Sequence, residues 1–303
     1  MSYVLDTNTP TPIILHFDSR FATSYLSTDS DGNPLSTNYL YTLIEPIIVP
    51  DGMSVLLSLH TATIPYSFYN VRAGVNTKVY YDIGGGTTSF DLDVGNYSAT
   101  GLASFMKTKL ELNAGLSATI AYSRETLKYT FTITGVPSFH FRFSNTTDSA
   151  CELMGYGAVD AEIPIGAPTK SLRAIDLNDS IHGLYIRQNL ATRVTLDNEL
   201  GTFSNILARL PITTNAGGII FYDPSMSDHS TLVHPHYIQS IVIKLTDDRN
   251  RAIDLNGLHW QVSFKICFVH KEDLRTPPER RPNAMPTEQK LMEKPKTRKK
   301  KST

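Results

Sequence analysis

The chain has 303 residues, of which 41% are hydrophobic and 19% are charged, and its formal net charge is −1. A chain of this length can build an apolar core without disulfides. Its two cysteines, Cys151 and Cys267, lie far apart and outside any C-x-x-C pattern, which excludes a disulfide framework and a zinc knuckle. Because no long uninterrupted apolar window and no signal-peptide pattern occurs, we expect no membrane-spanning segment, no secretion by the standard route, and a reducing compartment.

The charge of the chain is unevenly distributed. Residues 271–303 contain 11 Lys and Arg against 5 Asp and Glu, which leaves 17 against 24 for residues 1–270. Residues 1–270, with a net charge of −7, are therefore followed by a tail with a net charge of +6. Within residues 1–270, charged residues are few, and Thr, Ser, Asn and Tyr, which suit strands and turns, take their place. The composition therefore favours an all-β class.

The first segments indicate an arm followed by two strands. Residues 1–35 are rich in Thr, Ser, Asp, Asn and Pro, and we interpret them as an N-terminal arm. The one apolar run of this arm, Ile13–Phe17, is typical of a short strand or of a segment that lies on another surface. Two strand patterns, residues 41–50 and 53–65, follow on either side of an Asp-Gly turn. Pro46 indicates an edge position or a β-bulge in the first of them.

Residues 73–170 show a different pattern. The stretches KVYYDI and TSFDLDV flank the glycines at 84–86 as in a hairpin, and SATIAYS and LKYTFTI form two later strands. Between them NYSATGLASFMKTKLELNAG predicts a helix, with Ser98 or Thr100 as its N-cap and Gly115 at its C-terminal end. The apolar stripe of this helix has spacings of three and four: Leu102, Phe105, Met106 and Leu110. This order of strands and helix is typical of a self-contained α+β unit.

Five further strand patterns follow: IHGLYIRQ, NILARLPI, GIIFYD, YIQSIVIKL and LHWQVSFKICFV. With the three earlier strands they make eight, which is typical of a jelly roll, although a two-sheet sandwich of another topology would show the same spacing. We therefore predict an all-β fold: a single jelly roll, an eight-stranded antiparallel sandwich, formed by residues 36–72 and 171–270. Residues 73–170 are its small α+β insertion domain, and residues 271–303 are a basic disordered tail. In the last strand we expect alternate residues on one buried face: Leu258, Trp260, Val262, Phe264, Ile266 and Phe268.

Two patterns in the body could carry chemistry. The glycines at 84–86 lack the Lys-Ser/Thr pair and the helix that a phosphate-binding loop requires. His234 and His236 form an H-x-H pair that, with His259 as a third ligand, would suit a metal-dependent jelly-roll enzyme. No carboxylate follows the pair at the spacing that such a site requires, so a polar loop is the simpler interpretation. We expect no enzyme activity, no cofactor and no metal site.

A dense basic cluster lies in KPKTRKKKST at the end of the chain. Such side chains can neutralise the phosphates of a nucleic acid, which gives a salt-dependent affinity. Base specificity is not expected, because no aromatic residues are interleaved. The alternative is a solvated terminus without a partner. The candidate nucleic-acid contacts are Lys294, Lys296, Arg298, Lys299, Lys300 and Lys301.

Two parts of the sequence carry a resemblance to a known family. GNYSATGLASFMKTKLELNAG and the later SACELMGYG are similar to a G-N-Y helix and an S…L-G-F/Y turn, and YIQSIVIKLTDDRNRAIDLNGLHWQVSFKICF is similar to a strand pair that ends a barrel. These motifs, within residues 75–160 and 235–270, resemble those of the minor capsid proteins of virophages, polinton-like viruses and giant DNA viruses. The likeness is to the penton, or vertex, proteins of Mavirus-like virophages.

The resemblance implies a structural role. In that family an upright jelly roll, commonly with an insertion, forms a homopentamer at each five-fold vertex of an icosahedral capsid. Its partners are then itself and the surrounding major capsid protein. Packaged DNA is a further candidate partner on the charge of the tail alone. Its location is the virion, after synthesis in the host cytoplasm. The family provides no rule for the basic tail.

Two other interpretations stay open. The first is a glycan-binding attachment jelly roll whose inserted unit stacks sugars on tyrosines: Tyr80, Tyr81, Tyr97 and Tyr156. The second is the metal-dependent enzyme that would use His234 and His236.

Overall fold

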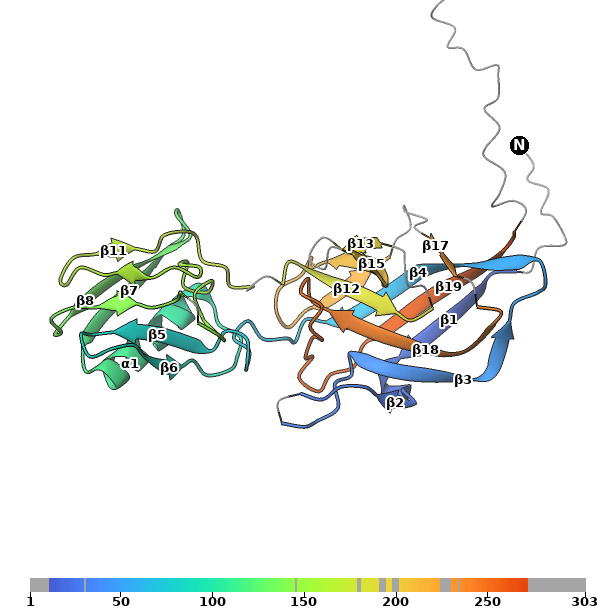
Figure 1. Cartoon of the computed structure of the whole chain (residues 1–303), viewed down its shortest axis with the longest axis horizontal. Coiled ribbons are helices and arrows are strands. Elements are labelled where there is room, and N and C mark those ends of the chain that lie inside the picture. The colour runs from blue at the N-terminus through green and yellow to red at the C-terminus, as the bar shows by residue number, and fades with distance from the viewer. Residues whose placement is uncertain are drawn as a thin grey trace, which may run out of the picture.

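β-Strands dominate the structure. The computed structural model describes residues 11–271, except residues 30, 145, 179–180, 191–194, 198–201, 224–229 and 234. Strands make up 46% of the residues that the structure describes and helix 8%, so the fold is all-β, as the composition indicates. Figure 1 shows a two-sheet body that contains both described ends of the chain, with a smaller unit, drawn in teal and green, beside it.

Sheet A of the body has β4 and β19 at its centre. β1 pairs with β19, β19 pairs with β4, and β16 and β17 pair with separate halves of the other edge of β4, all antiparallel. The bounds of these strands are β1, Ile13–Asp18; β4, Met53–Pro65; β16, Ile219–Tyr222; β17, Ser230–Val233; and β19, Gln261–His270.

Sheet B has the order β15-β12-β18-β3-β2, again antiparallel throughout. Its strands are β2, Ser24–Tyr25; β3, Asn38–Ile48; β12, Gly183–Gln188; β15, Ile206–Pro211; and β18, Tyr237–Thr246. A separate hairpin of β13, Thr195–Asp197, and β14, Thr202–Ser204, lies between β12 and β15 in the sequence.

The strand order is that of a jelly roll. With β2 and the β13–β14 hairpin set aside and β16 and β17 taken as two halves of one strand, the body has eight strands in chain order. Sheet A then has the order first, eighth, third, sixth, and sheet B the order second, seventh, fourth, fifth. This interleaving is the double Greek key of a jelly roll. The predicted fold is confirmed, and the inserted unit lies between the third and fourth strands.

The last strand shows why the sequence folds in this way. Alternation along β19 directs every second side chain into the space between the sheets. Five of the six residues expected there are at most 5% exposed: Trp260, Val262, Phe264, Ile266 and Phe268. The expectation for Leu258 was wrong, since it is 49% exposed. Leu258 follows Gly257, whose positive φ belongs to a turn, and β19 begins only at Gln261.

The inserted unit packs one helix against two small sheets. The sheet orders are β10-β9-β5-β6 and β11-β8-β7. The elements are β5, Lys78–Asp82; β6, Thr88–Asp91; α1, Ala99–Ala114; β7, Ser117–Ser123; β8, Lys128–Thr134; β9, His140–Phe141; β10, Ala161–Glu162; and β11, Thr169–Lys170. Ser98 caps α1 by accepting a hydrogen bond from the Gly101 N–H, and Gly115 ends it in the left-handed conformation. None of the described helices has the length and hydrophobicity of a membrane span.

The glycines at 84–86 lie in the turn between β5 and β6, as expected for a hairpin. The Asp82 carboxylate accepts hydrogen bonds from the N–H groups of Gly84, at 2.8 Å, and Gly86, at 3.2 Å. These amides are therefore used by the turn itself.

The body and the inserted unit have separate apolar cores. One cluster of buried residues lies between sheets A and B, and a second lies within the inserted unit. Val71 is fully buried in the second cluster, and Ile175 and Leu177 pack against it. The domain limits at residues 73 and 170 stay a prediction.

Candidate assembly surfaces

The structure does not bring together His236 and His259, two ligands of the alternative metal site. The His236 carbonyl accepts a hydrogen bond from the N–H of Val49, just beyond the end of β3. His259 lies at the opposite end of the body, two residues before Gln261, which pairs with Thr63 near the end of β4. His259, the third ligand of the alternative metal site, therefore does not lie beside His236, and His234 lies outside the described residues. Among those residues, no group of three or more His, Cys, Asp or Glu is placed to hold a metal ion.

The four tyrosines of the alternative glycan-binding interpretation do not form an exposed platform. Tyr81 and Tyr156 are 3% and 1% exposed and belong to the core of the inserted unit, so a role in sugar stacking was wrong for both. Burial raises the pKa of the Tyr156 hydroxyl well above its usual range. Tyr97 packs against Phe105, and its hydroxyl donates to the Asp93 carbonyl. Tyr80, whose hydroxyl donates to a backbone carbonyl at 3.1 Å, and Tyr97 are both partly exposed, but these two tyrosines alone do not make the four-residue platform.

The candidate nucleic-acid contacts all belong to the C-terminal tail. Lys294, Lys296, Arg298, Lys299, Lys300 and Lys301 lie outside the described residues. The last described residue, Lys271, donates from its N–H to the Gly52 carbonyl at 3.0 Å. The described part of the chain therefore ends beside the turn between β3 and β4.

β3 carries a large bulge opposite β18. Between the pairs Thr42–Ser240 and Ile47–Ile238, four residues of β3 face a single residue of β18. The extra residues cannot lie flat in the ladder and are pushed out of the sheet. Ile44, within the bulge, is 101% exposed. The bulge at residues 43–46 therefore exposes the apolar side chain of Ile44 fully to solvent.

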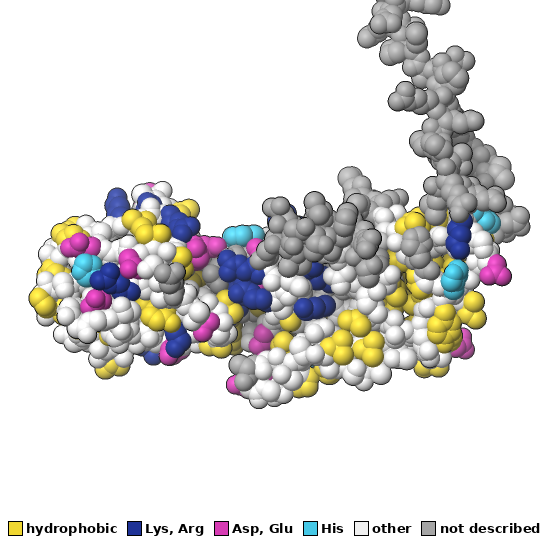
Figure 2. Space-filling model, in the orientation of Figure 1, with side chains coloured by type: hydrophobic (Ala, Val, Ile, Leu, Met, Phe, Trp, Pro, Cys, Tyr) yellow, Lys and Arg dark blue, Asp and Glu magenta, His cyan; other side chains and the backbone are white. Residues whose placement is uncertain are grey.

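The bulge belongs to a larger apolar area, here called the bulge face: Ile44, Glu45, Pro46, Ile48 and Tyr237. Ile48 and Tyr237 are cross-strand partners and are 70% and 52% exposed. Pro46, which cannot donate to the ladder, lies in the bulge as the sequence predicts. Glu45 places a negative charge beside Ile44. Figure 2 shows hydrophobic side chains at this end of the body.

The outer surface of sheet A carries a second apolar area, here called the row face. Leu232, Leu56 and Cys267 form a row across β17, β4 and β19, and Ile14 pairs with Lys265 beside it. Their neighbours along each strand point into the core, so these side chains point outward. Ile14 is 43% exposed and the others are half-buried. The row face consists of Ile14, Leu56, Leu232, Lys265, Cys267 and Val269.

The two faces lie on opposite sheets at the same end of the body. β3 ends at Ile48, and β4 begins at Met53 before running toward the inserted unit, which it enters after Pro65 (Figure 1). Both faces are therefore at the end away from the insertion. They carry opposite charges, Glu45 on the bulge face and Lys265 on the row face. Neither side chain has an ion-pair partner among the residues that the structure describes.

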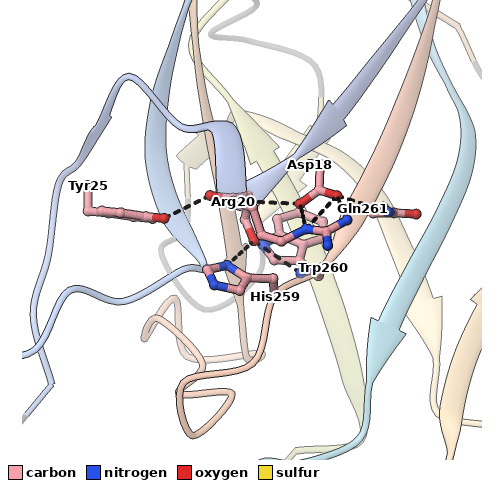
Figure 3. A network of polar contacts seen from close by, with 7 residues as sticks. Asp18, Arg20, Tyr25, His259, Trp260 and Gln261 are labelled. Carbon is pink, nitrogen blue, oxygen red and sulfur yellow. Dashed lines mark hydrogen bonds and ion pairs between the residues drawn. The ribbon is translucent and has the colours of Figure 1, made fainter.

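A charged corner ends β1 at the other end of sheet A (Figure 3). The Asp18 carboxylate accepts hydrogen bonds from the backbone N–H of Arg20 at 2.9 Å, from its Nε at 3.0 Å, and from Nε2 of Gln261 at 2.9 Å. The hydrogen bonds from Arg20 hold the pKa of Asp18 far below its usual range. Asp18 therefore stays ionised and ties the end of β1 to the start of β19.

Ser19 extends the same corner into the core. It is fully buried, and its Oγ accepts from the Trp260 N–H at 3.1 Å and lies 3.0 Å from Nδ1 of His259. Tyr25 donates to the Ser19 carbonyl at 2.9 Å (Figure 3). Residues 13–25 of the expected arm are thus part of the body.

A cavity of about 300 Å³ lies where the inserted unit meets the body. Beside it, the fully buried Asp247 carboxylate accepts from Nε of Arg251 at 2.7 Å and lies 3.7 Å from Nη1 of Arg72. Ser67 donates to the Leu255 carbonyl at 2.7 Å, which ties the same connection to the loop before β19. These charged groups serve the fold, because they fix the chain as it enters the insertion.

The comparisons with known proteins give a structural likeness only. No protein-family model matches the sequence, and no curated protein matches it. Among solved structures, the crystal structure of the mavirus penton protein is similar, with 11% sequence identity and a TM-score of 0.46. The match covers 86% of this chain and 100% of that chain. The jelly-roll fold is established by the strand order itself.

Proposed function

We propose that this chain is a structural, non-enzymatic subunit of an icosahedral virus capsid. In this proposal five copies form a ring at each five-fold vertex, and contacts with the major capsid protein hold the ring in the shell. The protein is made in the host cytoplasm and resides in the virion.

The motifs and the topology support this proposal from different directions. The G-N-Y helix, the L-G-Y turn and the final strand pair resemble those of penton proteins. The strand order independently gives a jelly-roll sandwich with one inserted unit between its third and fourth strands. Such a body offers its two outer sheet surfaces to neighbours.

The observation that carries the proposal is the apolar outer surface of the body. An antiparallel sheet that faces water usually has polar residues on its outer side. Here both sheets present apolar side chains outward, and Ile44, Ile48 and Tyr237 are each more than half exposed. Exposed apolar areas of this kind mark interaction sites. The apolar outer surface therefore supports association with other protein subunits as the function of the molecule.

Native mass spectrometry of the full-length protein tests this function. We expect a closed oligomer of five subunits, either alone or after addition of the major capsid protein. The inserted unit and the tail remain present in the experiment, because either could contribute contacts. Monomers alone under both conditions would contradict the proposal.

We also propose that the tail attaches the protein electrostatically to packaged DNA. The net charge of +6 in residues 271–303, against −7 in the rest of the chain, supports this role. The tail would supply attachment without base specificity.

A further inference from the structure

We infer that the bulge face of one copy packs against the row face of the next copy. This inference rests on the proposed self-association and names the surfaces that carry it. The occupant of each face is a second copy of this chain.

Different surfaces are needed for a ring. A contact that uses the same patch on both partners closes a two-fold dimer, whereas a ring of identical subunits requires two different patches that match one another. The bulge face and the row face are on opposite sheets, so one copy can use both at once. The body therefore has the two distinct sides that a head-to-tail contact requires.

The two faces also lie at the same level along the length of the body. Each lies at the end of the body away from the insertion, beside the connection from β3 to β4. A head-to-tail contact between patches at opposite ends would shift each copy along the axis and give an open helix. Patches at the same end allow the ring to close.

The shapes and charges of the faces are complementary. The bulge face projects, with Ile44 fully exposed at its crest. The row face is flat, because its side chains stand in register across three strands and are flanked by Ser54 and Ser58. Glu45 on one face and Lys265 on the other supply charges of opposite sign. Contact would therefore cover apolar surface on both sides and pair two charges that lack partners in the described part of one copy.

The first experiment removes the apolar contact. In the full-length protein, Ile44→Ser combined with Ile48→Ser should raise the dissociation constant of self-association at least about ten-fold, as measured by sedimentation velocity over a concentration series. Leu112→Ser is the matched control, because Leu112 is 78% exposed on α1 of the inserted unit. Its dissociation constant should stay within about two-fold of the unaltered protein. Circular dichroism melting checks that each variant is folded.

The second experiment tests whether the two faces meet each other. Glu45→Lys and Lys265→Glu should each weaken association, because each places like charges across the contact. The double variant should recover most of the lost affinity, since it restores an opposite pair in reversed order. Glu162→Lys, an exposed change of the same charge on the inserted unit, should have no effect.

The outcomes separate this inference from the proposed function. If the unaltered protein associates but the double variant shows no recovery, or the serine variants associate normally, these faces are not partners and the inference fails while the function stands. If the serine variants lose only binding to the major capsid protein, that protein occupies the bulge face and the inference also fails. If the unaltered protein remains monomeric with and without that partner, the proposed function itself fails.

Discussion

Asp18 shows how one carboxylate holds an edge strand in place. β1 is an edge strand of only six residues, and the carboxylate of its last residue accepts five hydrogen bonds, four from Arg20 and one from Gln261. Hydrogen bonds to a charged group contribute more than neutral ones. Ser19, next in the chain, continues the attachment to β19 through the N–H of Trp260. The sequence alone did not predict this corner, because its partners are more than 240 residues apart.

The lowered pKa of Asp18 predicts a pH-dependent stability. Because the folded pKa lies below the unfolded value of about 3.9, the carboxylate stabilises the fold above that pH. This contribution declines as the pH falls below about 4. Asp18→Asn should lower the free energy of unfolding by about 1 kcal/mol at neutral pH, and the difference should narrow in acid. Urea unfolding of the Asp18→Asn variant and of the unaltered protein at several pH values measures this difference in the free energy of unfolding.

The control for this prediction is Asp51→Asn, which changes an exposed carboxylate in the turn between β3 and β4. Its effect should be small throughout the pH range. A difference between Asp18→Asn and the unaltered protein that stays constant down to pH 3 would contradict the account of the corner.

Backbone geometry explains why the SACELMGYG motif has a glycine at position 155. Gly155 has a φ of +75°, and a Cβ added there would lie 2.5 Å from the backbone oxygen of Arg173. The Arg173 N–H in turn donates to the Gly155 carbonyl at 2.9 Å. The motif is therefore a close approach of two backbones within the inserted unit.

Gly155→Ala should lower the free energy of unfolding by about 2–4 kcal/mol, because backbone strain is joined by a clash that no side-chain rotation relieves. Gly166 is a matched control, since it has a similar φ of +78° with nothing within 4 Å of an added Cβ. Gly166→Ala should cost about 1 kcal/mol. Equal losses in thermal or chemical unfolding would show that the approach to Arg173 does not matter.

At the scale of elements, alternation predicted where most strands lie, but it predicted less well which of their side chains are exposed. The sequence patterns indicated all eight jelly-roll strands and α1, except that β17, the second half of the sixth strand, was not predicted. The exposed bulge of β3 was indicated only by Pro46, because alternation assumes an unbroken ladder and does not say how many residues leave it. Leu258 was misplaced for the same kind of reason, since a turn interrupts the pattern before β19. The pairing of sheet neighbours that builds the row face depends on strand order, which spacing does not determine.

The inserted unit should fold on its own, because it has a separate core. A fragment of residues 70–178 contains Val71, whose N–H and carbonyl both pair with Gly95, as well as Ile175 and Leu177. This fragment should give a dispersed amide NMR spectrum and a cooperative melt. A fragment cut at the expected limits, residues 73–170, should be less stable by about 2–4 kcal/mol, because it lacks these buried contacts. An unfolded longer fragment would show that the unit depends on the body.

At the scale of the whole molecule, the separation of charge predicts how the tail acts. Deletion of residues 290–303 should leave the melting temperature of the body unchanged and weaken binding to duplex DNA, measured by fluorescence anisotropy. The affinity of the full-length protein should fall steeply between 50 and about 200 mM salt, and the deletion should flatten that dependence. A variant with the same tail residues in scrambled order should bind as the full-length protein does. If the full-length protein shows no salt-sensitive affinity, the tail does not attach to DNA.

The central claim is that this jelly roll works through its shape, as a vertex subunit that associates with copies of itself. A cryo-electron microscopy reconstruction of an assembled particle containing the chain tests it most directly. We predict five upright jelly rolls around each five-fold axis, with the bulge face of each against the row face of its neighbour and the end of β19 available to direct the tail inward. Particles whose vertices hold a different protein, or that lack this chain in their shell, would contradict the account.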